Sequence, residues 1–126
     1  MVVGFVDTSV FVDTLRTYSP AVQWFKAQTQ SHKITPIIWM EVTGGALNKP
    51  AQTDALRLLN RFEMTYPTVE DMDWAMEKLM VYRLSHNISM NDCLIAAPAY
   101  RLQVPVYTQN VKHFAPLLGA LAQKPY

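Results

Sequence analysis

Three carboxylates lie within apolar sequence, and any fold of this chain must give each of them a partner. Asp7 follows the apolar run 2–6, Glu41 interrupts the run 37–42, and Asp92 comes directly before Cys, Leu, Ile and Ala residues. A buried carboxylate has to be paired, protonated or bound to a metal. At an effective dielectric near 20, two carboxylates about 4 Å apart repel by roughly 4 kcal/mol. Three converging acids therefore predict raised pKa values or a bound cation.

The composition predicts one compact domain over residues 1–126. Hydrophobic residues make up 50% of the chain and charged residues 17%, which is ordinary for a globular protein and unlike a disordered one. The formal net charge of +1 supplies no overall field that attracts nucleic acid, so a polyanion site would have to be local. A single cysteine excludes an intrachain disulfide, and no apolar run is long enough for a membrane span. We therefore expect a cytoplasmic protein with no membrane partner.

Strand-like and helix-like segments alternate along the chain. Apolar or β-branched sequence predicts short strands over 2–6, 33–35, 64–66 and 104–108. Cap residues, early prolines and apolar spacing near 3.6 residues predict helices over about 19–31, 36–48, 51–62, 70–84 and 91–102. This alternation is typical of an α/β domain with a mainly parallel central sheet. Ligands of such sheets collect beyond the carboxyl ends of the strands, where Asp7 and residues 108–110 would lie.

Two of the predicted helices have unusual features. The helix over 70–84 carries a stripe that suits either the core or a partner interface, formed by Met72, Ala75, Met76, Leu79 and Tyr82 or Arg83. The helix over 91–102 contains Pro98, which removes one backbone donor. We expect Pro98 to lie in the second turn, where the loss of a donor costs little because early helical amides lack partners within the helix.

Four ordered motifs resemble those of the PIN domain family. They are Val6-Asp7-Thr8-Ser9, the helical Glu41, the segment 91–97 (Asn-Asp-Cys-Leu-Ile-Ala-Ala) and the segment 107–114 (Tyr-Thr-Gln-Asn-Val-Lys-His-Phe). The size of the chain and the layout of the motifs are similar to VapC-type toxin ribonucleases. The resemblance implies a three-layer α/β/α fold and a Mg²⁺- or Mn²⁺-dependent endoribonuclease that is the toxin of a toxin–antitoxin pair. It also implies an RNA substrate, a small cognate antitoxin and a homodimer.

The same resemblance implies roles for individual residues. Asp7, Glu41 and Asp92 would be metal ligands, in agreement with the preference of hard divalent cations for oxygen. Asn110 would complete the catalytic site near the place where many relatives have a fourth acid. Hydroxyl groups are expected to orient Asp7 or a metal-bound water, and the residues that carry them are Thr8, Ser9 and Thr108.

Two other functions remain open from the sequence. One is a PIN-like binding module with a weakened acid set, which is favoured by the neutral Asn110 and by His113 nearby. The other is a receiver-type phosphoacceptor domain, which also combines an α/β sheet with an acidic pocket and Mg²⁺. A receiver normally needs an acidic pair near its first strand, and Asp7 has no acidic neighbour. We expect His113 to be a surface residue, the more common place for a single loop histidine.

Overall fold

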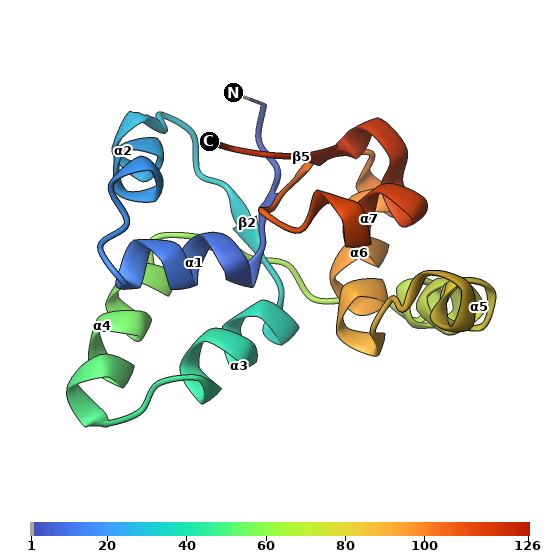
Figure 1. Ribbon diagram of the computed structural model, residues 1–126, viewed down its shortest axis with the longest axis horizontal. Helices are drawn as coiled ribbons and strands as arrows, with labels where there is room; N and C mark the ends of the chain where they lie inside the picture. Colours follow the sequence, from blue (N-terminus) through green and yellow to red (C-terminus); the bar gives the residue numbers. More distant parts are fainter. Residues whose placement is uncertain (1) are drawn as a thin grey trace.

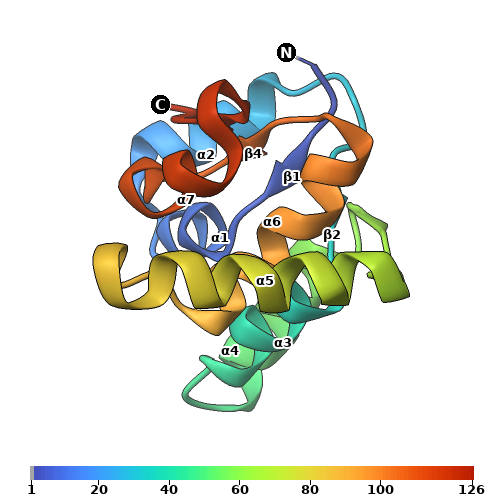
Figure 2. The same cartoon turned by 90° about the vertical axis from the view of Figure 1, so that its right-hand side faces the viewer.

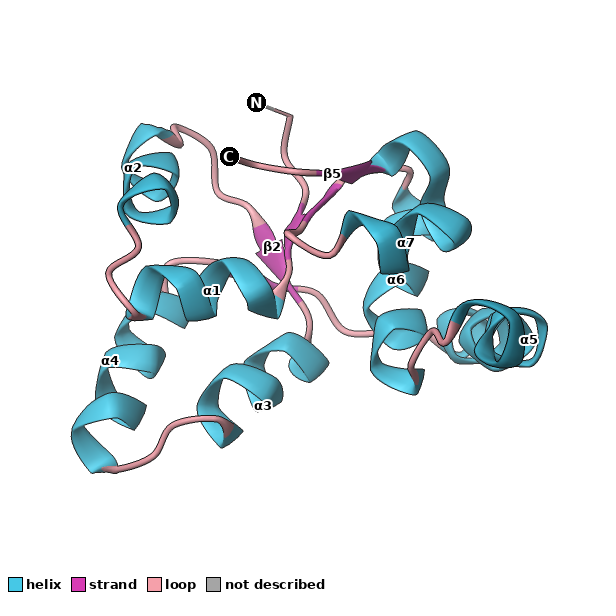
Figure 3. Ribbon diagram, in the orientation of Figure 1, coloured by secondary structure: helices cyan, strands magenta, loops and turns pink. Residues whose placement is uncertain are grey.

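Five short strands form one parallel sheet within residues 2–126, the part of the chain that the computed structural model describes. The strand order is β3-β2-β1-β4-β5, and every neighbouring pair is parallel. The strands are β1 (Phe5–Val6), β2 (Lys33–Ile34), β3 (Glu63–Met64), β4 (Val106–Tyr107) and β5 (Ala122–Gln123), and Figure 3 shows them at the centre of the molecule. The predicted strands were in the right places, although each is shorter than predicted, and β5 was not predicted.

Helices cover both faces of the sheet. Figure 1 shows α1 to α4 on one side of the central strands and α5 to α7 on the other. The helices are α1 (Thr8–Leu15), α2 (Ser19–Ala27), α3 (Pro36–Gly44), α4 (Lys49–Leu59), α5 (Val69–His86), α6 (Met90–Leu102) and α7 (Val111–Leu118), followed by a short 3₁₀ turn (Gly119–Leu121). The expected three-layer α/β/α architecture is therefore confirmed. No helix formed by residues 2–126 is both long and apolar enough to cross a membrane.

The first strand, β1, lies in the middle of the sheet. Its residues Phe5 and Val6 are fully buried, and they pair with β2 on one side and with β4 on the other. Gly4 allows this close approach, because a Cβ atom there would lie 2.5 Å from the Pro105 carbonyl oxygen. Because β1 is the central strand, the residue after its carboxyl end, Asp7, lies at the middle of one sheet edge.

Side-chain caps determine where the helices near this edge begin. Thr35 accepts a hydrogen bond from the Ile38 amide at the start of α3, which carries Glu41. Ser89 begins α6 with a reciprocal capping box, in which the Ser89 hydroxyl accepts from the Asp92 amide and the Asp92 carboxylate accepts from the Ser89 amide. Such a box satisfies two amides that have no partner within the helix. The capping box thereby fixes Asp92 in the first turn of α6.

Several predicted boundaries were wrong. Helix α2 ends at Ala27 instead of about residue 31, because Gln28 adopts extended backbone and its side chain donates to the Trp24 carbonyl. Helix α3 ends at Gly44 instead of residue 48, because Asn48 caps the next helix through a bond from the Ala51 amide. Helices α1 and α7 were not predicted at all.

Two further expectations need correction. Pro98 is the ninth residue of α6, past the early amides that lack partners within the helix. The cost of its missing amide donor is therefore not avoided in the way we expected. The helix nevertheless continues through it. The apolar stripe of α5 is divided between two environments, because Ala75 is buried whereas Met72 and Met76 are exposed. Its outer half therefore does not belong to the core of this chain.

Candidate active site

Asp7 lies directly after β1, and its carboxylate is almost completely buried. One carboxylate oxygen, Oδ2, accepts hydrogen bonds from Ser9 Oγ and Thr108 Oγ1, both at 2.8 Å. Burial raises the pKa of the Asp7 carboxyl, and the hydrogen bonds from Thr108 and Ser9 act in the opposite direction. Ser9 and Thr108 therefore contact Asp7 as the sequence led us to expect.

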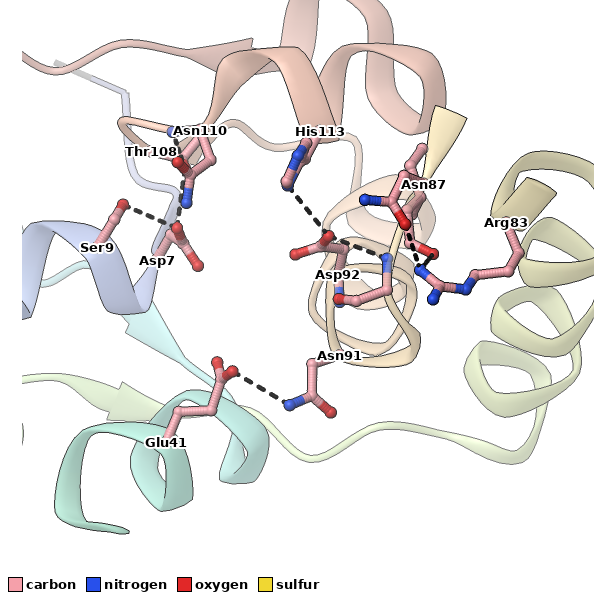
Figure 4. A network of polar contacts seen from close by, with 12 residues as sticks. Asp7, Ser9, Glu41, Arg83, Asn87, Asn91, Asp92, Thr108, Asn110 and His113 are labelled. Carbon is pink, nitrogen blue, oxygen red and sulfur yellow. Dashed lines mark hydrogen bonds and ion pairs between the residues drawn. The ribbon is translucent and has the colours of Figure 1, made fainter. Parts of the chain in front are cut away.

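The same two hydroxyl groups also hold the turn after β4. Thr108 Oγ1 accepts a hydrogen bond from the Asn110 amide at 2.9 Å, and Ser9 Oγ accepts one from the Gln109 amide at 3.1 Å. The first turn of α1 is thus joined to the turn that follows β4, about a hundred residues away in the sequence. This arrangement brings Asn110 beside Asp7, as Figure 4 shows.

Glu41 reaches the site from α3 and is half-buried. Its Oε1 accepts from Thr8 Oγ1 at 2.7 Å, and its Oε2 accepts from Asn91 Nδ2 at 3.1 Å. The Thr8 hydroxyl therefore contacts Glu41 and not Asp7, to which Thr8 offers only its backbone amide. Asn91 connects α3 with the start of α6, a contact that the sequence did not reveal.

Asp92 faces the site from the first turn of α6. Its Oδ2 accepts the capping bond from the Ser89 amide at 3.2 Å and lies 3.6 Å from Nδ1 of His113. The expectation for His113 was correct only in part, because its side chain is 45% exposed yet lies within ion-pair distance of Asp92. Its place in α7, which sequence analysis missed, accounts for this contact.

The three carboxylates line a single cavity of about 420 Å³. Figure 4 shows that they point toward one shared space from β1, α3 and α6. The cavity is lined by Asp7, Thr8, Ser9, Val12, Asp13, Glu41, Asp92, Gln109 and Asn110. Thr108 is fully buried and supports Asp7 from behind. Residues from four separate stretches of the sequence therefore converge at the carboxyl end of the sheet.

Asp13 is a fourth acid on the cavity wall that sequence analysis did not identify. Its Oδ2 accepts a hydrogen bond of 2.6 Å from the Tyr126 hydroxyl. Burial and this bond both raise the pKa of Tyr126, so the phenol remains a donor at neutral pH. Asp13 follows Ser9 by four residues and so shares its face of α1. A helix predicted over 8–15 would have revealed it.

The donor set suits a hard divalent cation, because it consists of carboxylate, hydroxyl and amide oxygens. Within residues 2–126, no three Asp, Glu, His or Cys side chains are close enough together to hold one ion. Glu41 is held by Thr8 and Asn91, and Asp92 by Ser89. A single ion bound by all three acids would therefore require the Glu41 and Asp92 side chains to move closer to Asp7.

Comparison with known proteins identifies the fold family. A family model described as the PIN domain matches residues 4–115. The chain belongs to the PIN domain family. No curated protein matches it in sequence. The receiver-type alternative is thereby set aside, since this PIN domain accounts for nearly all of the chain.

Solved structures share the fold of this PIN domain. A toxin–antitoxin complex from Klebsiella pneumoniae superposes with a TM-score of 0.80 at 23% identity over 98% of each chain. DNA-bound VapBC from Salmonella typhimurium has a TM-score of 0.79 at 20% identity over 100% of each chain. VapC20 of Mycobacterium tuberculosis, a sarcin-ricin loop cleaving toxin, has a TM-score of 0.75 at 16% identity over 90% of this chain and 94% of its own. At such identities the likeness is one of fold.

Proposed function

We propose that this PIN domain is a metal-dependent endoribonuclease and the toxin of a toxin–antitoxin pair. The observation that carries the proposal is the convergence of Asp7, Glu41 and Asp92 on one cavity at the carboxyl end of the parallel sheet. A buried carboxylate held by two hydroxyl groups is a costly arrangement that a bound cation would compensate. The fold likeness to VapC20, described as cleaving the sarcin-ricin loop, supports RNA as the substrate.

In this proposal Asp7, Glu41 and Asp92 bind Mg²⁺ or Mn²⁺, and Asn110 adds a neutral oxygen at the edge of the site. When bound, such an ion supplies a nucleophilic water and compensates charge on the phosphodiester. Ser9 and Thr108 fix the orientation of Asp7, and supporting bonds of this kind strengthen metal sites. Thr8 supports Glu41 in the same way.

A cognate antitoxin is the protein partner in this proposal, because the structural relatives include toxin–antitoxin and VapBC complexes. A groove of about 420 Å³ beside the acidic cavity shares Val12 and Glu41 with it and has a largely apolar wall that includes Leu15, Val42, Leu47 and Ala55. An antitoxin segment with apolar side chains in this groove and a cationic side chain next to Glu41 would block access to the acids. The single domain over 1–126 and the cytoplasmic location are part of the same proposal.

The test is cleavage of a mixed pool of single-stranded and structured RNA by the purified protein. We expect cleavage that requires Mg²⁺ or Mn²⁺ and stops with EDTA. Asp7→Asn and Asp92→Asn should each reduce the rate by about a hundredfold or more, because each removes a charged ligand, while the circular dichroism spectrum stays unchanged. Glu63→Gln is the control, because Glu63 is an exposed acid paired with Lys33 at another sheet position.

Undiminished cleavage by either site variant, with contaminating nuclease excluded, would overturn the assignment. Calorimetric titration with Mn²⁺ provides a second readout that does not depend on RNA. We expect Mn²⁺ to bind the wild type and the control, and to bind Asp7→Asn much more weakly. A protein that neither cleaves RNA nor binds Mn²⁺ would instead be the binding module, which the neutral Asn110 and the separation of the acids favour.

A further inference from the structure

Asn91 joins the two helices that carry Glu41 and Asp92. Figure 2 shows α6 above α3, and the two helices are in contact. Asn91 lies in the first turn of α6, directly before Asp92, and its Nδ2 donates a partly buried hydrogen bond of 3.1 Å to Oε2 of Glu41 on α3. Asn91 is not among the residues that line the acidic cavity. Any effect of its side chain on the cavity is therefore exerted through Glu41.

The Glu41 carboxylate is held from two sides. Thr8 Oγ1 donates to Oε1 at 2.7 Å, and Asn91 donates to Oε2. Thr8 directly follows Asp7 in the sequence, so its bond holds Glu41 on the Asp7 side of the cavity. Figure 4 shows Asn91 on the side of the Glu41 carboxylate that faces away from Asp7. The two hydrogen bonds therefore hold Glu41 in opposite directions.

The bond from Asn91 opposes an approach of Glu41 to the other acids. Within residues 2–126, no three Asp, Glu, His or Cys side chains are close enough together to hold one ion. If Glu41 moves toward Asp7, its carboxylate moves away from Asn91, and the bond between them breaks. The bond from Thr8 has no need to break, because Thr8 lies beside Asp7. Only one of the two bonds therefore stands against a closer arrangement of the acids.

We propose that Asn91 is a positioning residue that holds Glu41 away from Asp7 and thereby weakens ion binding. The inference rests on the proposed function, in which Asp7, Glu41 and Asp92 bind Mg²⁺ or Mn²⁺. Hydrogen bonds to charged groups are stronger than those between neutral groups. An ion that gathers the three acids has to compensate the loss of this bond, so its apparent affinity is reduced. Asn91 in this way sets how tightly the site binds the ion.

The first test is calorimetric titration of Mn²⁺ into the full chain without RNA. Asn91→Leu keeps a side chain of similar size but removes the donor, and Asn91→Ala removes the side chain beyond Cβ. We expect each variant to lower the Mn²⁺ dissociation constant by about fivefold or more, because the ion no longer has to break the bond. A group that merely supported Glu41 would give the opposite sign, since the loss of a supporting hydrogen bond weakens a metal site.

Two further variants provide the comparison. Thr8→Val removes the other hydrogen bond to Glu41 and should raise the Mn²⁺ dissociation constant, because Thr8 supports Glu41 on the Asp7 side. Asn60→Ala removes an exposed amide at the end of α4 and should leave the constant unchanged. Circular dichroism checks that each variant is folded. The two substitutions at Asn91 are independent, so the test stands even when one of them does not fold.

A second readout is the side-chain amide of Asn91 in NMR spectra of the wild type during a titration with Mg²⁺, which is diamagnetic. We expect the two amide protons to exchange faster with water and their signals to shift as Mg²⁺ binds, because the bond to Glu41 is lost. This signature reports on the bond itself and does not depend on cleavage of RNA.

The outcomes separate this inference from the proposed function. Mn²⁺ binding that is unchanged or weaker in the folded Asn91 variants would overturn the inference and leave the proposed nuclease intact. An Asn91 amide signal that stays the same up to saturation with Mg²⁺ would do so as well. A wild type that binds no Mn²⁺ would instead overturn the proposed function, and this inference with it.

Discussion

Asp7 has a carboxylate that the fold removes almost entirely from water. Because burial raises its pKa, the folded protein holds this proton more tightly than the unfolded chain, whose aspartates titrate near 3.8. As the pH rises from that value through the higher pKa of the folded state, the unfolded chain has lost its proton first, so the free energy of unfolding decreases. At neutral pH the burial of the Asp7 carboxyl therefore lowers the stability of the metal-free protein.

Asp7→Asn should accordingly stabilise the protein in metal-free buffer near neutral pH. We expect Tm to rise by about 2–6 °C, the change that roughly 1 kcal/mol produces in a chain of this size. The difference should disappear at pH values below the unfolded pKa, where Asp7 is protonated in both states. Added Mn²⁺ should reverse the order, because an ion that binds only the folded wild type raises its Tm. Thermal melts with and without Mn²⁺ at two pH values measure all of this, and a variant less stable than the wild type at neutral pH without metal would contradict it.

The sequence was sufficient to find three of the acids and the two hydroxyl donors of Asp7, but not the contacts of Glu41, Asp92 and Asp13. Asp7, Glu41 and Asp92 were recognisable because charge within apolar sequence needs a reason. Asp13 was missed because the helix over 8–15, which places it on the same face as Ser9, was not predicted, and its partner Tyr126 lies more than a hundred residues away in the sequence. The Thr8 hydroxyl was expected on Asp7, yet the start of α1 directs it to Glu41.

Among the secondary-structure elements, α5 and α6 are joined by a two-bond ion pair whose carboxylate is almost completely buried. Arg101 Nε lies 2.9 Å from Asp71 Oδ1, and Arg101 Nη2 lies 3.1 Å from Oδ2. Burial alone would raise the pKa of Asp71, but Arg101 and the Thr68 amide together hold it below its ordinary value. This pair therefore stabilises the fold above the unfolded pKa of Asp71, and the contribution is lost as the pH falls through the lower pKa of the folded state.

Arg101→Ala should reduce the free energy of unfolding by about 2–3 kcal/mol at neutral pH, because it leaves the buried Asp71 charge without its partner. This loss is smaller than the roughly 3–5 kcal/mol usual for breaking a fully buried ion pair, because the Arg101 side chain is 35% exposed. Urea denaturation at neutral and at acidic pH measures the loss, which should shrink once Asp71 is protonated. Arg57→Ala is the matched control: its partner Asp54 is 64% exposed, and about 0.5 kcal/mol or less is expected. Equal losses in the two variants would contradict the assignment.

Element prediction failed where packing outweighs local preference. Helix α1 is rich in Val, Thr and Phe, residues with modest helix propensity, and it forms because Val10 and Phe11 are fully buried, Phe11 against the rings of Phe25 and Phe62. Helix α7 contains Pro116, and a proline inside a segment argues against a helix when only residue propensities are considered. Strand β5 is two residues long and exists only as an edge partner of β4. Long periodic segments such as α5 were predicted within two residues at each end.

Across the whole molecule, the order of the strands in the sheet differs from their order in the sequence. The central strand β1 comes first in the chain, but one of its two neighbours, β4, begins at Val106. The Asp7 carboxylate likewise receives one of its two hydroxyl hydrogen bonds from Thr108, in this late segment. The core is closed by fully buried residues of the last third of the chain, including Tyr107 and Phe114. The fold therefore cannot be completed from its first hundred residues.

A fragment of residues 1–103, which ends before β4, should lack a cooperative thermal transition and should not bind Mn²⁺. The reason is that β1 loses a neighbour and Asp7 loses one of its two hydroxyl donors. A fragment of residues 1–121, which lacks the edge strand β5 and the Tyr126 hydrogen bond to Asp13, is the control and should keep a cooperative transition at a lower Tm. Circular dichroism melts distinguish the two, and a cooperative transition in the shorter fragment would contradict the argument.

The central place of β1 also has a consequence during translation. A ribosome makes Asp7 among the first residues, yet the acidic cavity cannot assemble until the segment with Thr108 has emerged from it. Domains generally fold as units as the chain is made, so a nascent chain of this protein lacks the assembled acidic cavity through most of its synthesis. If the proposed ribonuclease function holds, RNA near the ribosome that makes the chain would be spared until the chain is nearly finished.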